Sequence, residues 1–471
     1  MSFMVAFGLV GIMLCVAMIL RTKIPFFRTM LVPSSVLAGI LGMLVLNTGL
    51  ITLTDANMFA TIVGHLFTVI FISIGLTGTS KTKEQPDSDS KEILKGSIGL
   101  GMIWNMIFAF TPVVGALVVL AIGGYFGMSA VYGLLIPFGF AQGPGQAVVI
   151  GTIFEQQYGI ENAAMVSLTF ASIGFLACFA VGVPLAKYGL KKGLAKGVNR
   201  DNGNNEFIER GYYKKDEESS SLGNETMFSG NMDTLSFHFA VIGVCFLMAL
   251  GIGELVKFIP GLGPTLGALL FLYGMIAGYI VKFILKKLKI DYMLDNTLQT
   301  KVTGWSTDYL VVTAFMAIQF SLIVEWAIPI LAVSVVVTAV TFFIVLYFGQ
   351  RLGGEDDFSR TLGLFGAATG TVPSGIALVR IIDPSLRTNT PVELGLMNLP
   401  MLCYLVSLST ILAIAGGALS LTAGLLILLI PIPVYLIILK IFKVWGNKTY
   451  HIKEVNLNRK IVNPNMEKEI I

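Results

Sequence analysis

Charged residues are scarce in this chain of 471 residues. Asp, Glu, Lys and Arg together make up 13% of it, while hydrophobic residues make up 55%. Soluble domains typically carry about 25% charged residues. The shortage of charge therefore excludes an ordinary soluble domain and favours a chain that is surrounded by lipid.

Cysteine and the motifs of soluble enzymes are also rare or missing. The four cysteines all lie inside apolar runs, so buried thiols that act as small hydrophobic groups are expected, and no disulfide framework or thiolate metal site. The spellings GxxxxGK[ST], HExxH and GxGxxG after a strand do not occur. We expect neither an enzyme nor an ATP-driven pump, and no nucleic-acid partner.

Long apolar runs are abundant instead. A helix needs about 20 residues to cross the hydrocarbon core of a bilayer. Basic residues follow the first run and do not precede it, which predicts a first span with its N-terminus outside and not a cleavable signal. Eleven candidate spans are Met4–Leu20, Met30–Leu50, Phe59–Gly78, Ile93–Ile122, Ala164–Ala186, Leu235–Phe258, Thr265–Leu285, Tyr309–Val324, Ile328–Phe348, Leu394–Ala415 and Leu421–Phe442.

Two further apolar stretches, 128–154 and 358–382, are broken near the middle by glycine-rich runs at 140–146 and 366–373. Their halves of about a dozen residues are too short to cross a core of about 30 Å. If both stretches fold back, every Lys and Arg except Lys257 lies on the cytoplasmic side. If the first stretch crosses instead, four lysines between 187 and 196 move outside. The positive-inside rule therefore favours two re-entrant hairpins.

The same count predicts the domain organisation. Residues 1–186 and 234–415 each contain five spans with a hairpin before the fifth, and the two halves begin in opposite directions, which is an inverted repeat. Residues 187–233 are polar and predict a flexible cytoplasmic linker. An extra span at 416–443 and a charged, partly disordered cytoplasmic tail at 444–471 complete the predicted all-α integral membrane fold.

The two hairpin tips are the predicted binding site. Irregular backbone at membrane depth is tolerated only where protein or a water-filled cavity surrounds it, so the tips are expected to meet near the midplane. Helix N-termini there suit a carboxylate, and unwound carbonyls suit Na⁺. No residue is assigned as a metal ligand. The candidate substrate-binding residues are Gln142, Gly143, Pro144, Gly145, Gln146, Thr369, Gly370, Thr371, Pro373, Ser374 and Arg380.

Some candidates have a second interpretation. Ser and Thr in membranes often make ordinary contacts between helices. Arg380 either grips a substrate carboxylate or extends to the cytoplasmic interface, where it helps to fix the topology. Outside the tips, Glu254 and Lys257 are three residues apart, which predicts a local ion pair, and Asn105 is a candidate cavity or interhelix contact.

Several stretches resemble the bacterial glutamate:sodium symporter family. They are Gly143-Pro-Gly-Gln146, Tyr158-Gly159, Asn162-Ala163, Gly182-Val-Pro-Leu-Ala-Lys-Tyr188, Gly370-Thr-Val-Pro-Ser-Gly-Ile-Ala377, Val32-Pro33 and Ala38-Gly39. The similarity covers most of 1–415 loosely and the two hairpins well. Two features depart from the family pattern. The typical first tip, Gly-Gly-His-Gly, reads Gln-Gly-Pro-Gly at 142–145, and the extra C-terminal span is atypical.

The resemblance implies an elevator-type transporter that imports glutamate together with Na⁺ by alternating access. It also implies a multi-pass homodimer in the bacterial cytoplasmic (inner) membrane. The distribution of Lys and Arg predicts that the N-terminus lies outside and the C-terminus in the cytoplasm. The changed first tip lies where selectivity is set, so a carrier of another small carboxylate or amino acid remains an alternative. A membrane sensor or interaction protein that does not transport is an alternative of another class. The expected partners are a small anionic, glutamate-like substrate, the coupling ion Na⁺ and the lipid bilayer.

Overall fold

The computed structural model describes residues 2–29, 32–49, 56–77, 90–194, 210–215, 217, 221–259, 263–383 and 388–451. In these ranges every regular element is a helix. Seven helical segments there are long and apolar enough to cross a membrane, which identifies a multi-pass membrane protein by length and composition. The helices form two groups, each of which combines stretches from both halves of the chain.

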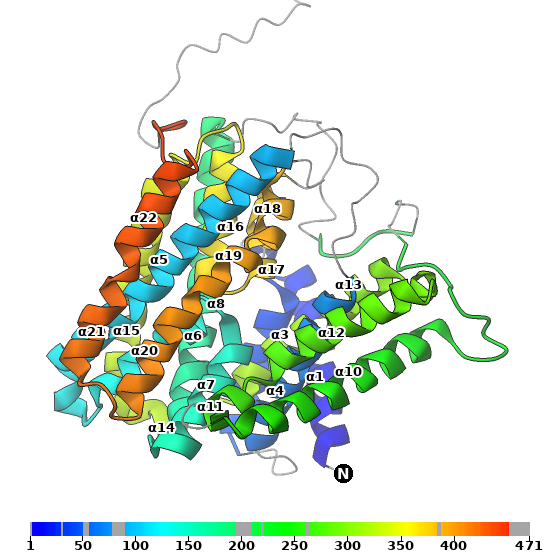
Figure 1. Ribbon diagram of the computed structural model, residues 1–471, viewed down its shortest axis with the longest axis horizontal. Coiled ribbons are helices and arrows are strands. Elements are labelled where there is room, and N and C mark those ends of the chain that lie inside the picture. The colour runs from blue at the N-terminus through cyan, green and yellow to red at the C-terminus, as the bar shows by residue number, and fades with distance from the viewer. Residues whose placement is uncertain are drawn as a thin grey trace, which may run out of the picture.

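The first bundle contains helices from residues 2–77 and 234–316. Its helices are α1 (Ser2–Lys23), α3 (Ser34–Asn47), α4 (Ala56–Thr77), α10 (Thr234–Lys257), α12 (Leu270–Lys287) and α13 (Asn296–Met316). Helix α4 packs against α12 and α13, while α3 packs against α1 and α13 (Figure 1). Glycines let α4 and α12 approach closely, since a Cβ added to Gly75 would lie 3.0 Å from the Cα of Gly278.

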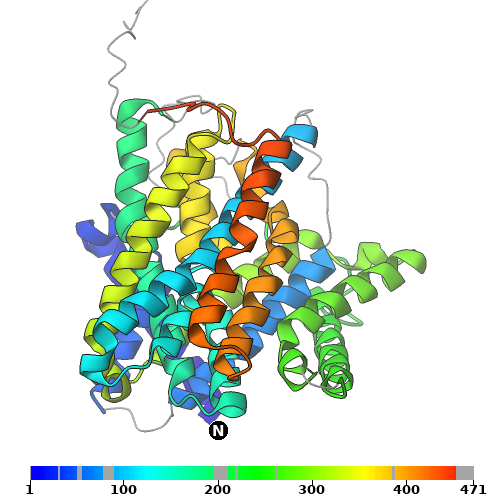
Figure 2. The same ribbon diagram turned by 60° about the vertical axis from the view of Figure 1, so that its left-hand side comes forward.

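The second bundle contains helices from residues 90–192 and 327–441 together with both hairpins. The helices are α5 (Ser90–Ile122), α8 (Ala163–Lys192), α15 (Ala327–Gly349), α18 (Thr390–Leu396), α19 (Asn398–Met401), η5 (Leu402–Tyr404), α20 (Leu405–Ala415), α21 (Leu421–Leu429) and α22 (Pro431–Ile441). Helix α5 contacts α15, α18 and α22. Figure 2 shows α5 in cyan beside the orange C-terminal helices, with the green helices of the first bundle to one side.

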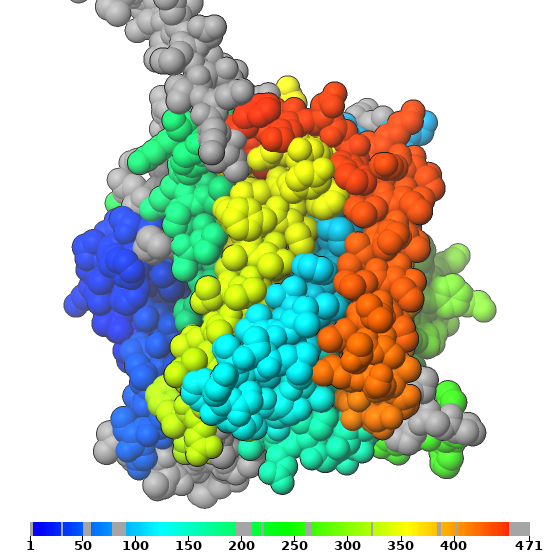
Figure 3. Space-filling model, turned by 90° about the vertical axis from the view of Figure 1, so that its left-hand side faces the viewer, coloured from blue at the N-terminus to red at the C-terminus, as the bar shows by residue number. Residues whose placement is uncertain are grey.

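One face of the second bundle is built from α15, α5 and α21–α22, which lie side by side in Figure 3. Large apolar side chains on these helices are exposed, among them Leu120, Val335 and Leu426. A lipid-facing helix carries its apolar side chains outward because lipid takes the place of water. This face therefore suits contact with the bilayer.

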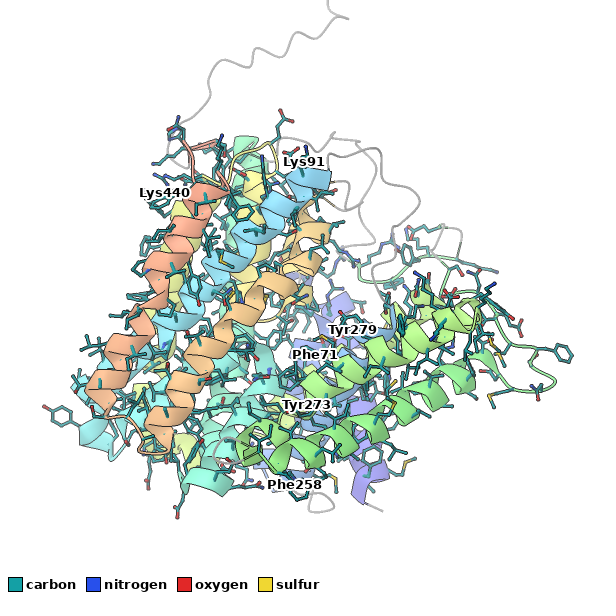
Figure 4. The ribbon with its side chains drawn as sticks, in the orientation of Figure 1. Phe71, Lys91, Phe258, Tyr273, Tyr279 and Lys440 are labelled. Carbon is teal, nitrogen blue, oxygen red and sulfur yellow. The ribbon has the colours of Figure 1, made fainter. Side chains whose placement is uncertain are left out.

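The ends of the molecule follow the predicted distribution of charge. Figure 4 places Lys91 and Lys440 at one end and Phe258 at the opposite end. The N-terminus lies at the end away from Lys91 and Lys440 (Figure 1). The sequence predicted that Lys91 and Lys440 share one side of the membrane and that the N-terminus lies on the other.

The predicted span Tyr309–Val324 is wrong, because the helix α13 begins at Asn296 and ends at Met316. The first half of α13 is polar, and part of that polarity is buried inside the first bundle. Gln299 is fully buried and accepts a hydrogen bond of 2.9 Å from Ser73 on α4. A hydropathy scan misses such a helix because it scores buried, hydrogen-bonded polar groups as if they faced lipid.

Two other predicted spans also differ from the structure. The stretch 394–415 is not one continuous helix but is broken between α18, α19, η5 and α20, and Pro400, which has no backbone N–H, lies within the broken section. Helix α3 has only 14 residues, Ser34–Asn47, and is shorter than the predicted span, which ran from residue 30 to residue 50.

Part of the predicted flexible linker is packed. Asp295 caps α13 by accepting the N–H of Leu298 at 2.7 Å, and it also binds the side chain of Asn224 at 3.1 Å. Thr226 donates to the carbonyl of Met293 at 2.8 Å. Burial raises the pKa of Asp295, but the hydrogen bonds from Leu298 and Asn224 outweigh burial and hold that pKa below its ordinary value. The linker is therefore docked at residues 224–226, while 195–209, 216 and 218–220 lie outside the described residues.

All four cysteines are free. Cys178 and Cys245 are buried as predicted, but the prediction is wrong for Cys15 and Cys403, which are exposed on the surface of the chain. An apolar run does not by itself reveal which of its faces turns away from the protein.

Candidate functional site

The first broken stretch consists of two helical arms. The first arm is η2 (Ala130–Leu135) followed by α6 (Ile136–Phe140), and the second arm is α7 (Gly143–Tyr158). Gly143 has a φ of +77°, which glycine adopts readily and other residues rarely do. Pro144 lies in the first turn of α7, where a missing N–H costs nothing, so it begins the helix and interrupts no hydrogen bond within it.

The second broken stretch consists of α16 (Asp357–Thr369) and α17 (Val372–Ile382), which pack against each other. Only Gly370 and Thr371 lie between them. The two arms touch through their backbones, since a Cβ on Gly366 would lie 2.6 Å from the Cα of Gly375. Both predicted breaks are thus turns between helices, and in each the second helix begins within a residue or two of a proline.

The two tips meet. A Cβ on Gly143 would lie 2.5 Å from Cγ2 of Thr371 and 3.3 Å from the carbonyl oxygen of Gly370. Helix α8 lies behind both tips, because a Cβ on Gly174 would lie 2.6 Å from the carbonyl oxygen of Thr369 and 3.3 Å from the ring of Phe140. Segments more than 200 residues apart in the chain are therefore in contact, as the sequence predicted for the two tips.

Uncapped helix N-termini face this junction. Neither Gln142 before α7 nor Thr371 before α17 caps its helix with a side-chain hydrogen bond. The first backbone N–H groups of a helix lack intrahelical partners, and the N-terminus carries the positive end of the helix dipole. Two such ends at one place suit an anion such as a carboxylate.

Unpartnered side-chain groups provide a second, independent sign of a ligand. Gln146 is only 1% exposed, yet its Nε2 has no hydrogen-bond partner among the described residues. Oε1 of Gln142 is likewise buried without a partner there. Burying a polar group without a partner is costly. A bound solute that accepts from Gln146 and donates to Gln142 removes this cost.

The hydroxyl groups of the second tip are already occupied to different degrees. Thr369 donates to the carbonyl oxygen of Phe365 at 2.7 Å, which is the ordinary helix contact considered as an alternative. Thr371 and Ser374 bond each other at 3.1 Å. Pro373 is exposed at the start of α17, and Gly145 packs against Phe67 of the first bundle.

Arg380 is not brought to the tips. It lies exposed near the end of α17, nine residues after Thr371, which corresponds to about 13 Å along a helix. This position favours the interpretation that Arg380 extends to the cytoplasmic interface.

An aromatic cluster supports the first tip, and the sequence did not reveal it. Nε1 of Trp104 donates to the carbonyl oxygen of Ala141 at 3.2 Å. The hydroxyl group of Tyr404 makes a hydrogen bond with the side chain of Gln142. Phe108 stacks on Trp104 with ring centroids 5.2 Å apart and meets Tyr404 edge-on, also at 5.2 Å. No spacing in the sequence links α5 to η5, so only the fold shows this cluster.

A buried ionic network holds the base of the second hairpin. Arg360 is 1% exposed and binds both carboxylate oxygens of Glu393, at 2.5 and 2.7 Å. It also donates to Asp357 at 3.1 Å. The sequence predicted that Arg360 lies on the cytoplasmic side of the membrane, and it predicted no role for Glu393. A charged residue among apolar ones was the available signal, since such residues usually pair.

The segment after α22 is docked on the same base. Thr449 donates to Asp357 at 2.6 Å, and the hydroxyl group of Tyr450 bonds that of Thr361 at 2.6 Å. Val444 and Tyr450 are 3% and 5% exposed. The predicted tail thus begins with a packed strap, residues 444–450, whereas 452–471 lie outside the described residues.

The tips themselves carry no charge, because 139–146 and 366–375 contain no Asp, Glu, Lys or Arg. Across the described residues no group of three or more His, Cys, Asp or Glu is placed to hold a metal ion. Buried oxygens without a described partner lie on the helices around the tips: Asn105 Oδ1, Ser167 Oγ and Ser172 Oγ. Hard cations prefer oxygen ligands of this kind.

Two predictions away from the tips are confirmed. Lys257 and Glu254 form an ion pair of 2.6 Å. Asn105 makes a contact between helices, because it donates to the carbonyl oxygens of Gly101 at 2.8 Å and of Pro400 at 2.9 Å.

Buried polar groups at two helix breaks inside a membrane bundle are typical of secondary membrane transporters. The family model described as "Sodium/glutamate symporter" matches residues 1–385, and the chain belongs to this family. The match ends before α18, so Glu393, Tyr404 and the strap lie beyond it. A search of curated proteins finds no match for the chain.

Proposed function

We propose that this protein imports glutamate together with Na⁺, and that the substrate binds where the two hairpin tips meet. The contact of Gly143 with Thr371 and Gly370 carries this proposal, because it brings two uncapped helix N-termini to one place. These termini receive carboxylate groups without any charged side chain. Gln146 adds a buried donor to the same site.

The two bundles provide parts for alternating access. Both tips belong to the second bundle, and α7 packs against α4 and α13 of the first. We propose that the second bundle moves as an elevator along the first, with Gly145 and Phe67 at the sliding contact. Each half of the chain contributes its first helices to the first bundle and its later helices to the second. This common division supports the predicted inverted repeats, 1–186 and 234–415, with an extra span at 416–443.

Sodium is the coupling ion in this proposal. The side-chain oxygens of Asn105, Ser167 and Ser172 are buried without a hydrogen-bond partner among the described residues, which suits a cation. The remaining expectations stay part of the proposal: a homodimer in the bacterial inner membrane, with its N-terminus outside and its C-terminus cytoplasmic.

Uptake of labelled L-glutamate into proteoliposomes tests the function. We expect uptake with an inward Na⁺ gradient and only background uptake when choline replaces Na⁺. If glutamate uptake is equally fast with Na⁺ and with choline, transport is not coupled to Na⁺. A panel of other small carboxylates and amino acids, added as competitors, distinguishes glutamate from the alternative substrates.

The Gly145→Val and Gly370→Val variants distinguish transport from a sensor role. A Cβ on Gly145 would overlap the ring of Phe67, and one on Gly370 would lie 3.0 Å from Oγ of Ser374. A transporter loses uptake in both variants. A protein that only senses or docks tolerates them.

A further inference from the structure

We propose that Gln142, positioned by Tyr404, binds the ammonium group of the substrate and so selects an amino acid over the corresponding plain dicarboxylate. This inference rests on the proposed function and adds a specificity-determining residue to its site. It concerns one of the two positions, 142 and 144, at which the first tip departs from the family pattern.

The side chain of Gln142 offers an acceptor that nothing else uses. Its Oε1 is buried and has no hydrogen-bond partner among the described residues. The amide of Gln146, by contrast, leaves a donor, Nε2, without a partner there. An acceptor therefore needs a donor and a donor needs an acceptor at the same tip, and a zwitterion supplies both.

Gln142 and Gln146 flank the N-terminus of α7. Gln142 immediately precedes the helix and Gln146 is its fourth residue, with the turn at Gly143 between them. The uncapped N-terminus of α7 lies between them and favours negative charge. An ammonium group at Gln142 and a carboxylate group at Gln146 match the open acceptor of the first side chain and the open donor of the second.

The orientation of Gln142 is set from behind by the aromatic cluster. The hydroxyl group of Tyr404 bonds the Gln142 side chain, and Trp104 holds the adjacent carbonyl of Ala141 at 3.2 Å. Tyr404 and Trp104 meet edge-on at 6.2 Å and are 8% and 0% exposed. Tyr404 is therefore a positioning residue, and its effect on the substrate passes through Gln142.

The test compares L-glutamate with glutarate, which has both carboxylates and no ammonium group. Inhibition constants of both are measured against Na⁺-driven uptake of labelled glutamate. In the Gln142→Ala variant we expect the preference for glutamate over glutarate to fall about 10-fold or more, the loss that accompanies one hydrogen bond to a charged group. Affinity for glutarate should change little, which also shows that the variant is folded.

Two more variants sharpen the result. Gln142→Glu keeps the acceptor and should retain or raise the preference for glutamate. Tyr404→Phe keeps the ring contacts and loses only the hydroxyl group, so it should raise the KM for glutamate about threefold to tenfold with little change in kcat. Gln156→Ala is the matched control, since Gln156 is an exposed glutamine at the far end of α7.

The outcomes separate this inference from the proposed function. If the wild-type protein shows no Na⁺-driven uptake of glutamate, the proposed function fails. If uptake is present but the glutamate-to-glutarate preference is the same in wild type, Gln142→Ala and Tyr404→Phe, the assignment of Gln142 is wrong. A Gln142→Ala variant that needs more Na⁺ at an unchanged preference also overturns the assignment, because Oε1 then serves the cation.

Discussion

The two hairpins bring similar tips to the site but are held in different ways. The first tip carries two glutamine side chains and leans on the aromatic cluster, through Trp104 and Tyr404. The second tip carries hydroxyl groups and is held at its base by the ionic network of Arg360. Selectivity is thus expected from the first hairpin and rigidity from the second, although both expose a helix N-terminus.

The largest loss of stability is expected at Arg360, the centre of the ionic network that holds the second hairpin. In an Arg360→Ala variant, Asp357 and Glu393 remain as buried carboxylates without their cation. Breaking a buried ion pair in this way costs about 3–5 kcal/mol. Thermal unfolding of the purified protein in detergent measures the loss.

The matched control for this prediction is Arg380→Ala, which removes an exposed arginine from the other arm of the same hairpin. Its unfolding temperature should stay close to that of the wild type. Equal losses in the two variants contradict a special role for the buried network.

A second prediction concerns the contact between the tips. The Gly143→Ala variant must place a Cβ 2.5 Å from Thr371 at a φ of +77°, a conformation that costs a non-glycine residue about 1–2 kcal/mol. We expect the initial rate of Na⁺-driven uptake to fall at least about 10-fold while the protein still inserts into the membrane. Gly243→Ala is the control, because a Cβ there meets nothing within 4 Å.

A third prediction separates the strap from the network beneath it. Tyr450→Phe removes the hydroxyl group that bonds Thr361 and keeps the ring that packs on Phe358. One neutral hydrogen bond contributes about 0.5–1.5 kcal/mol, so a small drop in unfolding temperature is expected. Lys448→Ala, on the exposed side of the strap, should leave the unfolding temperature unchanged. If Tyr450→Phe lowers the unfolding temperature as much as Arg360→Ala does, the strap contributes as much stability as the network and the prediction is wrong.

The smallest effect is expected for substrate affinity in Arg380→Ala. Arg380 lies about 13 Å along α17 from the second tip, too far to bind a carboxylate held there. The KM for glutamate should stay within about twofold of the wild type. A rise of tenfold or more shows that Arg380 reaches the substrate and that the second hairpin also contributes to selectivity.

The helical hairpins were predictable because glycine and proline act locally. Gly143 and Pro144, like Gly370 and Pro373, mark where a helix ends and the next begins, whatever surrounds them. Helix α13 was misplaced for the opposite reason. Its buried Gln299 accepts a hydrogen bond from Ser73 of another helix, and hydropathy along the sequence does not record that partner.

The candidate site divides in the same way. Gln142, Gln146 and Thr371 could be proposed from the sequence because they flank the breaks. Trp104 and Tyr404 were missed because their role depends on how α5 and η5 pack, some 300 residues apart in the chain. The pairing of Arg360 with Glu393 was missed because a basic residue near a predicted membrane edge looks the same whether it faces water or a buried carboxylate.

The sequence by itself determined three features of this protein. It lies in a membrane, its helices break at predictable positions, and the breaks carry no charged residues. Those features follow from local chemistry: apolar length, backbone freedom and the scarcity of Asp, Glu, Lys and Arg. Only the tertiary structure decided which polar groups find partners. Arg360 is paired with two carboxylates, whereas Gln142 and Gln146 have an open acceptor and an open donor within the part of the chain that the structure describes. Hydrogen bonds depend on neighbours in space and not on neighbours in the chain.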